Sequence, residues 1–323
     1  MTPQRVIVVG SYNQDMAWRS ERFPAPGETR LGRFQAGPGG KGFNQAVAAA
    51  RQGATVCFVG ALGADDLADT ARAVVQHERI DARWQSVGAE ATGTAAIWLD
   101  HSGQNEIIVA PGANLALSPE HIDAHADAFA DASVLVTQHE VAPEATLRAM
   151  QRAARHGLLR IHNPAPAQRP PQFDAMLALT DVLTPNESEF AALFERAATP
   201  IRADAVATLA DADLHALCRR LPVATVVITL GASGIFVSHA DAASRGDASA
   251  CYRIAAEAVE VVDTTGAGDA FNGGLAASRA LGADRPFAEH VRHGNRVAAC
   301  AVACQGAALA MPYRDDVLRR FPG

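Results

Sequence analysis

The chain of 323 residues lacks several features that mark common classes of protein. Its five cysteines include no C-x-x-C pair, which argues against a disulfide framework and favours a reducing compartment. No lysine- or arginine-rich block occurs, and the net charge of −7 argues against nucleic acid or an anionic membrane as a partner. Aromatic residues make up only 6% of the chain, so helices are expected to pack closely through the abundant alanines. The expected partner is a small molecule.

No segment has the properties of a targeting sequence or a membrane anchor. The apolar run Val6–Val9, close to the N-terminus, is too short for a signal peptide or a membrane-spanning helix. We therefore expect a cytoplasmic protein that has no membrane partner.

The familiar nucleotide-binding loops are absent as well. Around Lys41, a Walker A motif would require glycine where Gln35 stands and a hydroxyl residue where Gly42 stands. The segment Gly37–Gly42 formally fits G-x-G-x-x-G, but it does not directly follow the first predicted strand. In addition, Leu62 occupies the position where a dinucleotide-binding fold carries an acid. P-loop chemistry and a dehydrogenase reaction are therefore disfavoured.

The spacing of Cys300 and Cys304 would place both thiols on one face of a helix. A metal site needs further ligands, and no neighbouring histidine or cysteine pair offers them. Both cysteines are therefore interpreted as small core residues.

Short apolar runs alternate with longer amphipathic stretches from end to end. Buried strands are predicted at Val6–Val9, Thr55–Val59, Val134–Val136, Leu158–Ile161, Val182–Leu183, Thr225–Thr229 and Ile235–Val237. Helices are predicted at Lys41–Arg51, Asp65–His77, Pro143–His156, Asn186–Arg196 and Asp211–Arg220. This alternation predicts an α/β fold with a mostly parallel central sheet and helices on both faces, formed by residues 1–323 as a single domain.

Two regions break this alternation. Residues 12–36 show a strand-like pattern without a helix, and residues 95–110 predict a hairpin around His101–Gln104. Both are expected to form a second, small β-sheet. The segment Ala240–Ala250, rich in Ala, Ser, Asp and Gly, predicts a surface hairpin loop.

The segment Gly266–Asp269 carries the most informative chemical pattern. It follows the apolar run Val259–Val262, predicted as a strand, and precedes a run of small residues predicted as a helix. Its glycines would let an anion approach the unpaired N–H groups of the first helical turn. Asp269 would hold a carboxylate beside that anion, which suits phosphoryl transfer. A capped helix after a glycine turn would have the same pattern.

A second glycine cluster, Gly37–Asn44, runs into an alanine-rich helical stretch. Its backbone, Lys41 and the amide of Asn44 would meet a polyol at the start of that helix. Asn13 and Asp15 follow the first strand, at the edge where open α/β sheets bind ligands. A carboxylate and an amide suit vicinal hydroxyl groups. The simpler alternatives are a loop with a solvated lysine and an Asx turn after a strand.

Together these two clusters resemble the signatures of the ribokinase-like (PfkB) family of carbohydrate kinases. The resemblance spans essentially the whole chain, because further segments agree in order and spacing: Gly10–Asp15, Pro26–Thr29, Gln138–Glu140, Asn163–Pro166, Thr184–Glu189 and Thr229–Gly234. It implies that the small sheet is a lid over a sugar site, and that in many members this lid pairs two subunits as a homodimer. A lid suits a kinase because it excludes water that would compete for the phosphoryl group.

The resemblance further implies an ATP-dependent phosphotransferase, most similar to the members that phosphorylate the 5-hydroxyl group of D-ribose. The implied catalytic residues are Asp269 as the base and Gly266, Ala267 and Gly268 as the anion site. The implied sugar-binding residues are Asn13, Asp15, Gly39, Gly40, Lys41, Asn44 and Glu140.

The resemblance also assigns residues to ATP, Mg²⁺ and K⁺. The implied ATP-binding residues are Asn186, Glu189, Thr229, Leu230, Gly231, Gly234, Gly268 and Asn295. Asn186 and Glu189 match the family's N-x-x-E, which would reach Mg²⁺ through water, but they equally fit a helix capping box. The implied K⁺ ligands are Asp263, Thr265, Ala301, Cys304, Gly306 and Ala310. Cys304 and Ala310 differ from the residues usual in the family, although carbonyl ligands do not depend on those side chains.

Two alternative functions stay open from the sequence. The first keeps the reaction and changes the acceptor to a nucleoside, another pentose or a ketohexose derivative. The combination of Asn13, Asp15, Lys41 and Glu140 favours a free sugar with several hydroxyl groups. The second is a sensor that binds sugar or nucleotide without turnover. Asp269 argues against a sensor, since binding alone does not need a carboxylate beside an anion site.

Overall fold

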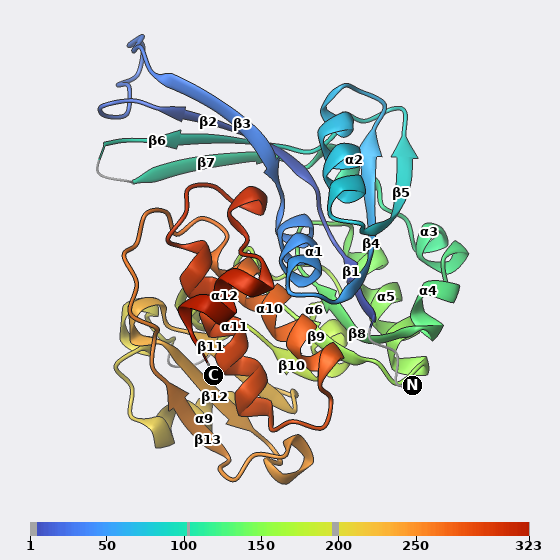
Figure 1. Cartoon of the computed structure of the whole chain (residues 1–323), viewed down its shortest axis with the longest axis vertical. Helices are drawn as coiled ribbons and strands as arrows, with labels where there is room; N and C mark the ends of the chain where they lie inside the picture. The colour runs from blue at the N-terminus through green and yellow to red at the C-terminus, as the bar shows by residue number, and fades with distance from the viewer. Residues whose placement is uncertain (1–4, 102–103, 196–199, 323) are drawn as a thin grey trace.

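The computed structural model describes residues 5–101, 104–195 and 200–322 (Figure 1). In this part of the chain, a central sheet of nine strands has the order β13-β12-β11-β10-β9-β8-β1-β4-β5. The ladders from β11 to β5 are parallel, and β12 and β13 add an antiparallel edge. The bounds are β1 Arg5–Val9, β4 Thr55–Gly63, β5 Asp81–Val87, β8 Ala132–Thr137, β9 Leu159–His162, β10 Val182–Leu183, β11 Thr225–Thr229, β12 Ile235–His239 and β13 Cys251–Ile254.

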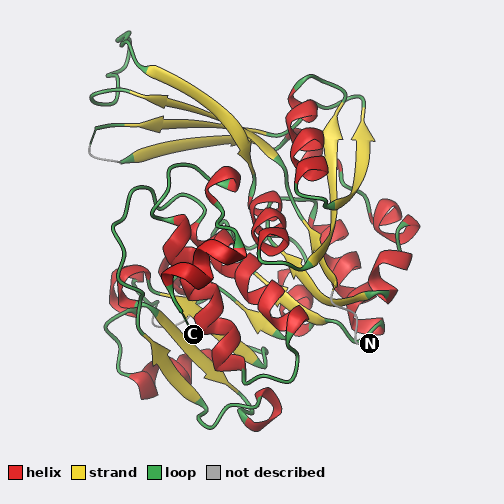
Figure 2. Cartoon of the chain, viewed as in Figure 1, coloured by secondary structure: helices red, strands yellow, loops and turns green. Residues whose placement is uncertain are grey.

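Helices cover both faces of this sheet, because successive residues of a strand point to opposite sides (Figure 2). Val6 and Val8 of β1 share a core cluster with α1, α2, α10, α11 and α12, whereas Ile7 and Val9 share another with α3, α4 and α5. A third cluster joins α6, α7, α8 and α9 to β10, β11 and β12. The bounds are α1 Lys41–Arg51, α2 Leu67–His77, α3 Pro119–Ala124, α4 Asp127–Ala130, α5 Pro143–Arg155, α6 Phe173–Ala178, α7 Glu187–Ala192, α8 Ala203–Val206, α9 Asp211–Cys218, α10 Ala267–Leu281, α11 Phe287–Ala301 and α12 Arg314–Arg320.

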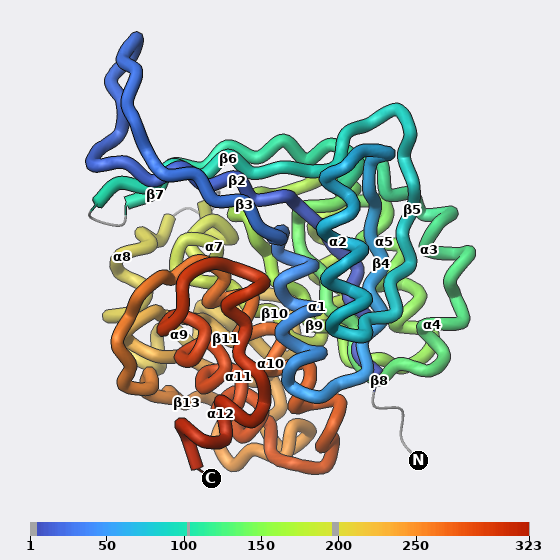
Figure 3. Tube along the Cα trace, turned by 45° about the horizontal axis from the view of Figure 1, so that its top comes forward, coloured from blue at the N-terminus to red at the C-terminus, as the bar shows by residue number. Residues whose placement is uncertain are grey.

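The predicted second sheet is present, with the order β3-β2-β6-β7. It projects from the body in Figure 1 and lies along the top of the molecule in Figure 3. The bounds are β2 Asn13–Arg19, β3 Arg33–Gly39, β6 Thr94–Leu99 and β7 Asn105–Ala110. The hairpin predicted around His101–Gln104 joins β6 to β7, and residues 102–103 of its loop lie outside the described residues. We call this sheet the lid.

The α/β architecture and the predicted strands of the central sheet are confirmed, but the strand predicted at Val259–Val262 is wrong. Val261 and Val262 are 58% and 60% exposed. The N–H of Val262 donates to the carbonyl of Val302 at the end of α11, at 2.8 Å, instead of joining a strand ladder. The apolar run is therefore a connection across the end of α11.

Two smaller corrections concern helix ends. The helix predicted at 186–196 is shorter, since α7 spans Glu187–Ala192 and residue 196 lies outside the described residues. Cys300 is buried as predicted, but Cys304 is exposed because α11 ends at Ala301. Within the described ranges, we find no helix that combines the length and the apolar character needed to cross a bilayer.

Helices α1 and α10 pack closely against each other on the same face of the sheet. A Cβ atom at Gly273 would lie 2.4 Å from the Cβ of Ala48 and 2.6 Å from the carbonyl oxygen of Gln45. Real Cβ atoms do not come this close, so the contact between the two helices requires glycine at this position. The absence of a side chain lets the first turn of α1 reach the first turn of α10.

We predict that Gly273→Ala destabilises the protein by about 1–3 kcal/mol, because the added methyl group must push α1 away from α10. Urea unfolding monitored by circular dichroism measures this change. The matched control is Gly88→Ala, since a Cβ at Gly88 meets no heavy atom within 4 Å. Its effect should stay within about 0.5 kcal/mol. Equal stability of the two variants would contradict the role assigned to the α1–α10 contact.

Candidate active site

The candidate site lies at the carboxyl edge of the parallel strands, where open α/β sheets bind ligands. Ser11 follows β1, Gln138–Glu140 follow β8, Asn163 follows β9 and Thr184 follows β10. The N-termini of α1 and α10 also meet at this edge, because Asn44 and Gln45 of α1 both contact Asp269 of α10. Segments far apart in sequence therefore bring their polar groups to one place.

Asp269 lies in the first turn of α10 and is only 6% exposed. The amide of Asn44 donates to its Oδ2 at 2.9 Å, and the amide of Gln45 donates to its Oδ1 at 2.9 Å. Burial raises the pKa of Asp269 to about 6, although Lys41 and the two amides lower it. A carboxylate with such a pKa is ionised at neutral pH and is a stronger base than an exposed one.

A cluster of carboxylates surrounds the half-buried Lys41. Burial alone would lower the pKa of Lys41, but the negative charges of Asp269, Glu140, Glu189 and Asp15 raise it, so the ammonium form is favoured. Conversely, burial together with the charges of Glu140 and Asp269 raises the pKa of Asp15 to about 7. The site therefore holds an ammonium group among several acids. This combination suits a ligand with several hydroxyl groups and a phosphoryl group that carries negative charge.

Glu140 is held at the start of α1. Its Oε2 accepts a hydrogen bond from the hydroxyl of Ser11 at 2.6 Å and from the backbone N–H of Lys41 at 2.9 Å. Gly40, the N-cap residue, has no side chain to satisfy the first turn of this helix. Glu140 therefore supplies the cap from a different strand end, as well as a carboxylate that faces the site.

Asn13 and Asp15 start strand β2 of the lid and lie beside this cluster. The Oδ1 of Asn13 accepts a hydrogen bond from Asn114 at 2.9 Å, and Asn114 also brackets the backbone of Tyr12. Gly39 pairs with Asn13 in the β2–β3 ladder, directly before Gly40 and α1. The lid and the first turn of α1 are thus continuous at this point.

Asn44 has an unused acceptor. Asn44 is 5% exposed, and its Nδ2 donates to Asp269. Its Oδ1 is buried and has no hydrogen-bond partner among the described residues. An unpaired buried carbonyl is unfavourable by about 1–3 kcal/mol. A ligand hydroxyl that donates to this oxygen would remove that cost.

A cavity of about 90 Å³ opens between the lid and the body of the protein. Its lining residues are Asp15, Ala17, Gln35, Ala36, Gly37, Pro38, Ile97, Leu99, Asp263, Thr265, Gln305, Gly306, Ala307 and Leu309. One wall is therefore the lid, and the other comprises the loops that precede α10 and follow α11. The sequence did not suggest Gln35, Ile97 or Leu99 of the lid, or Gln305 after α11, as site residues, because no motif marks these positions.

The start of α10 offers free backbone donors. Gly266, its N-cap residue, has φ 74°, in the left-handed region that favours glycine. The N–H of Ala267 donates to the carbonyl of Thr264 at 3.2 Å. Within the described ranges, the N–H groups of Gly266, Gly268 and Asp269 have no such partner. The open donors therefore include the N–H of Asp269 itself, while that of Ala267 is engaged.

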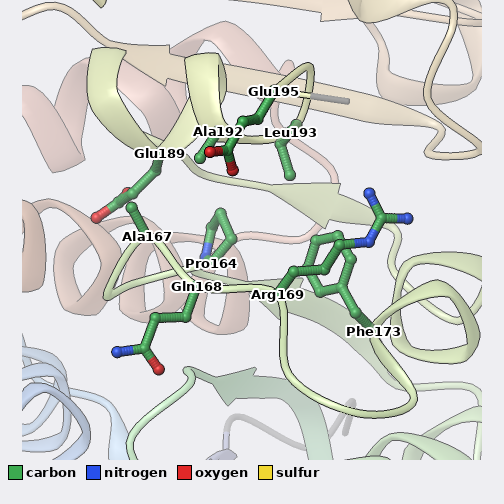
Figure 4. Close-up of a pocket in the computed structure, with 9 residues that line it drawn as sticks. All are labelled: Pro164, Ala167, Gln168, Arg169, Phe173, Glu189, Ala192, Leu193 and Glu195. Carbon is green, nitrogen blue, oxygen red and sulfur yellow. The ribbon is translucent and has the colours of Figure 1, made fainter. Parts of the chain in front are cut away.

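Asn186 and Glu189 form the capping box that the sequence left as one alternative. The Oδ1 of Asn186 accepts from the N–H of Glu189 at 2.8 Å, and Oε2 of Glu189 accepts from the N–H of Asn186 at 2.9 Å. Burial raises the pKa of Glu189, even though Lys41 and the cap bond lower it. A small cavity beside Glu189 has Arg169 on its opposite side, over the ring of Phe173 (Figure 4).

The residues expected near ATP fall into two groups. Thr229 ends β11 beside Asn186, and the tight turn that follows leads through Leu230, Gly231 and Gly234 into β12. Asn295 lies on α11, where its amide donates to the carbonyl of Ala255 at 2.9 Å. Ala255 packs against Gly234, so Asn295 is connected to the turn through this backbone.

Of the residues expected to bind K⁺, Thr265 and Gly306 contact Asp263 through hydrogen bonds. Oδ1 and Oδ2 of Asp263 accept from the N–H groups of Thr265 at 2.9 Å and Gly306 at 3.0 Å. Burial raises the pKa of Asp263, but these hydrogen bonds outweigh it and lower the pKa. The carbonyl of Ala301 accepts from the N–H of Cys304 at 3.0 Å.

Comparisons with known proteins identify the family of this chain. The family described as "pfkB family carbohydrate kinase" matches residues 3–314. Ribokinase of Haemophilus influenzae is 37% identical over 315 residues, which cover 97% of each chain.

Solved structures show the same likeness. Ribokinase of Thermotoga maritima has a TM-score of 0.83 at 32% identity, covering 97% of this chain and 98% of the other. Arabidopsis thaliana ribokinase, in complex with ribose and ATP, has a TM-score of 0.80 at 28% identity, covering 99% and 98%. The chain therefore belongs to the pfkB family of carbohydrate kinases and is a phosphotransferase with an alcohol acceptor.

Proposed function

We propose that this protein transfers the γ-phosphoryl group of ATP to the 5-hydroxyl group of D-ribose. The observation that carries the proposal is the buried Asp269 carboxylate, fixed by two amides beside a helix N-terminus with unpaired N–H groups. Relatives named ribokinase support ribose as the acceptor, and the Arabidopsis thaliana ribokinase structure supports ATP as the donor.

The sugar would lie in the cavity between the lid and the body. Asp15 lines this cavity, and Lys41 and Glu140 belong to the charge cluster that adjoins it. The free Oδ1 of Asn44 would accept one hydroxyl group of the sugar. Asn13, Gly39 and Gly40 shape the adjoining backbone. The apolar lid residues Ile97 and Leu99 would cover the sugar and exclude water from the reacting group.

In the reaction, Asp269 takes the proton of the 5-hydroxyl group as its oxygen forms a bond to the γ-phosphorus. The bond from this phosphorus to the β,γ-bridging oxygen breaks, and ADP leaves. The N–H groups of Gly266, Gly268 and Asp269 stabilise the charge on the phosphoryl oxygens. Ala267 contributes mainly to the turn. Thr229, Leu230, Gly231, Gly234 and Asn295 would hold the nucleotide.

Mg²⁺ and K⁺ fit this arrangement in different ways. Mg²⁺ retains most of its waters, so Asn186 and Glu189 would bind it through water while they cap α7. It would neutralise charge on the triphosphate. K⁺ would lie beside Asp263, whose lowered pKa keeps it anionic, with carbonyl ligands from Thr265 and the segment 301–310.

The outer face of the lid suggests a homodimer. Trp18, Phe34, Trp98 and Ile108 lie on one face and are 40%, 58%, 40% and 69% exposed. The opposite face carries Ala17, Gln35 and Ile97, which line the sugar cavity. An exposed apolar face of this kind is typical of a protein interface. A second copy of the lid would cover it.

The substrate assignment predicts that ADP release is fastest with D-ribose in a panel that includes other pentoses, a ketohexose and nucleosides. A coupled assay with and without K⁺, at fixed Mg²⁺ and ATP, measures kcat/KM for each acceptor. Faster turnover of a nucleoside would change the acceptor, and no ADP release with any of them would favour a sensor.

We predict that replacement of the base Asp269 affects turnover but not ribose binding. Asp269→Asn should lower kcat at least about a hundredfold, because the amide cannot accept the hydroxyl proton, while ribose affinity stays within about threefold. Isothermal titration with ribose and a turnover assay measure the two quantities. Asp315→Asn, an exposed change of the same chemistry on α12, should leave both unchanged. Near-normal turnover of Asp269→Asn would remove Asp269 from the mechanism.

The homodimer predicts a change in mass when the outer lid face is charged. Ile108→Glu together with Phe34→Glu should convert a dimer into a monomer, because two carboxylates would be buried without partners. Light scattering after size-exclusion chromatography measures this mass. The control is Leu318→Glu, which charges an exposed apolar side chain on α12, away from the lid. A wild-type monomer at micromolar concentration would contradict the proposed interface.

A further inference from the structure

Beyond the proposed function, and resting on it, we propose that Gln45 is a positioning residue that keeps the Asp269 carboxylate oriented and ionised for proton transfer. Gln45 does not reach the sugar cavity. It is fully buried in the first turn of α1 and acts through Asp269.

Every hydrogen-bonding group of the Gln45 side chain is used. Its Nε2 donates to Oδ1 of Asp269 at 2.9 Å and to Oδ1 of Asn163 at 3.2 Å. Its Oε1 accepts from Nε2 of Gln138 at 2.6 Å. A primary amide has two N–H donors, and both are committed. The side chain therefore has one orientation that satisfies all of these partners.

The direction of this network is set by a backbone group that can only accept. The carbonyl of Thr184 accepts from Nδ2 of Asn163 at 2.9 Å, so the Oδ1 of Asn163 must face Gln45. The Nε2 of Gln45 must then face both Asn163 and Asp269. The hydrogen bonds that run from Thr184 through Asn163 to Gln45 thus leave the Nε2 of Gln45 as the donor to Asp269.

Such a donor favours the charged carboxylate. Protonation of Asp269 weakens the hydrogen bond from Gln45, and in a buried site this loss is large because water does not replace it. Asn44 makes the matching contact with the other carboxylate oxygen. The two amides lower the pKa of Asp269 against the effect of burial, alongside Lys41, whereas Glu140 raises it. Asp15 and Glu189 also face this charge cluster.

Removal of this donor therefore predicts a shift of the pH profile. The wild-type kcat should fall as pH decreases through about 6, where Asp269 becomes protonated. Gln45→Met keeps the apolar volume and removes the N–H, so the pKa of Asp269 rises and the acid limb moves up by about one pH unit. At pH 6.5 kcat should fall severalfold, and at pH 9 it should return to within about threefold of wild type.

The matched control is Gln52→Met at the other end of α1. Gln52 is 1% exposed, and its amide donates to the carbonyl of Pro312 at 2.8 Å, without contact to Asp269. This variant loses a buried amide in the same way but should keep the wild-type pH profile. Gln138→Met removes the donor that fixes the Oε1 of Gln45, so it should move the acid limb in the same direction by a smaller amount.

The test is the kcat profile of wild type and the three variants between pH 5 and 9, with ribose and ATP saturating, together with their thermal unfolding midpoints. An acid limb that shifts in Gln45→Met and Gln138→Met, but not in Gln52→Met, supports the inference. Uniform loss of activity without a shift, or an equal shift in Gln52→Met, overturns it. Turnover in Asp269→Asn would instead defeat the proposed function, so the two failures are distinguishable.

Discussion

A buried carboxylate remains ionised only where hydrogen-bond donors replace the water that it has lost, and this requirement organises the structure around Asp269. Helix α10 alone places the carboxyl group at the sheet edge but does not supply side-chain donors for it. The donors come from Asn44 and Gln45 of α1. Their reach depends on the contact at Gly273, where the two helices pack without a side chain between them. Packing in the core therefore determines the chemistry at the edge.

The lid sheet has two faces, and only one of them lines the cavity. The strand period of two places Asp15 and Ile97 on the cavity side and Trp18 and Ile108 on the outer side. The outer side chains Trp18 and Ile108 are 40% and 69% exposed, so this apolar face is open to a further partner. The proposed sugar site and the proposed subunit interface would thus use opposite faces of the same strands.

Much of this could be predicted from local sequence signals. Apolar periodicity identified the strands of the central sheet except the two edge strands β5 and β13, which alternate less clearly. Glycine turns located the starts of α1 and α10. The run Val259–Val262 misled because a short apolar segment looks the same in a strand and in a connection. Asn114 could not be found, since its role depends on a fold that carries it 102 residues back to Tyr12. Gln45 stands next to Asn44 in the sequence, but its role depends on partners that the fold brings from α10 and from the ends of β8 and β9.

Glu140 connects the candidate active site with the start of helix α1. One of its oxygens closes the open end of α1 across the sheet, a task that a neighbouring side chain usually performs within the same helix. A descendant of this protein that abandoned its present substrate would therefore not be free to discard this acid, because the helix would begin to fray. Retention of Glu140 in such a descendant would reflect its role in capping α1 and would say nothing about the ligand.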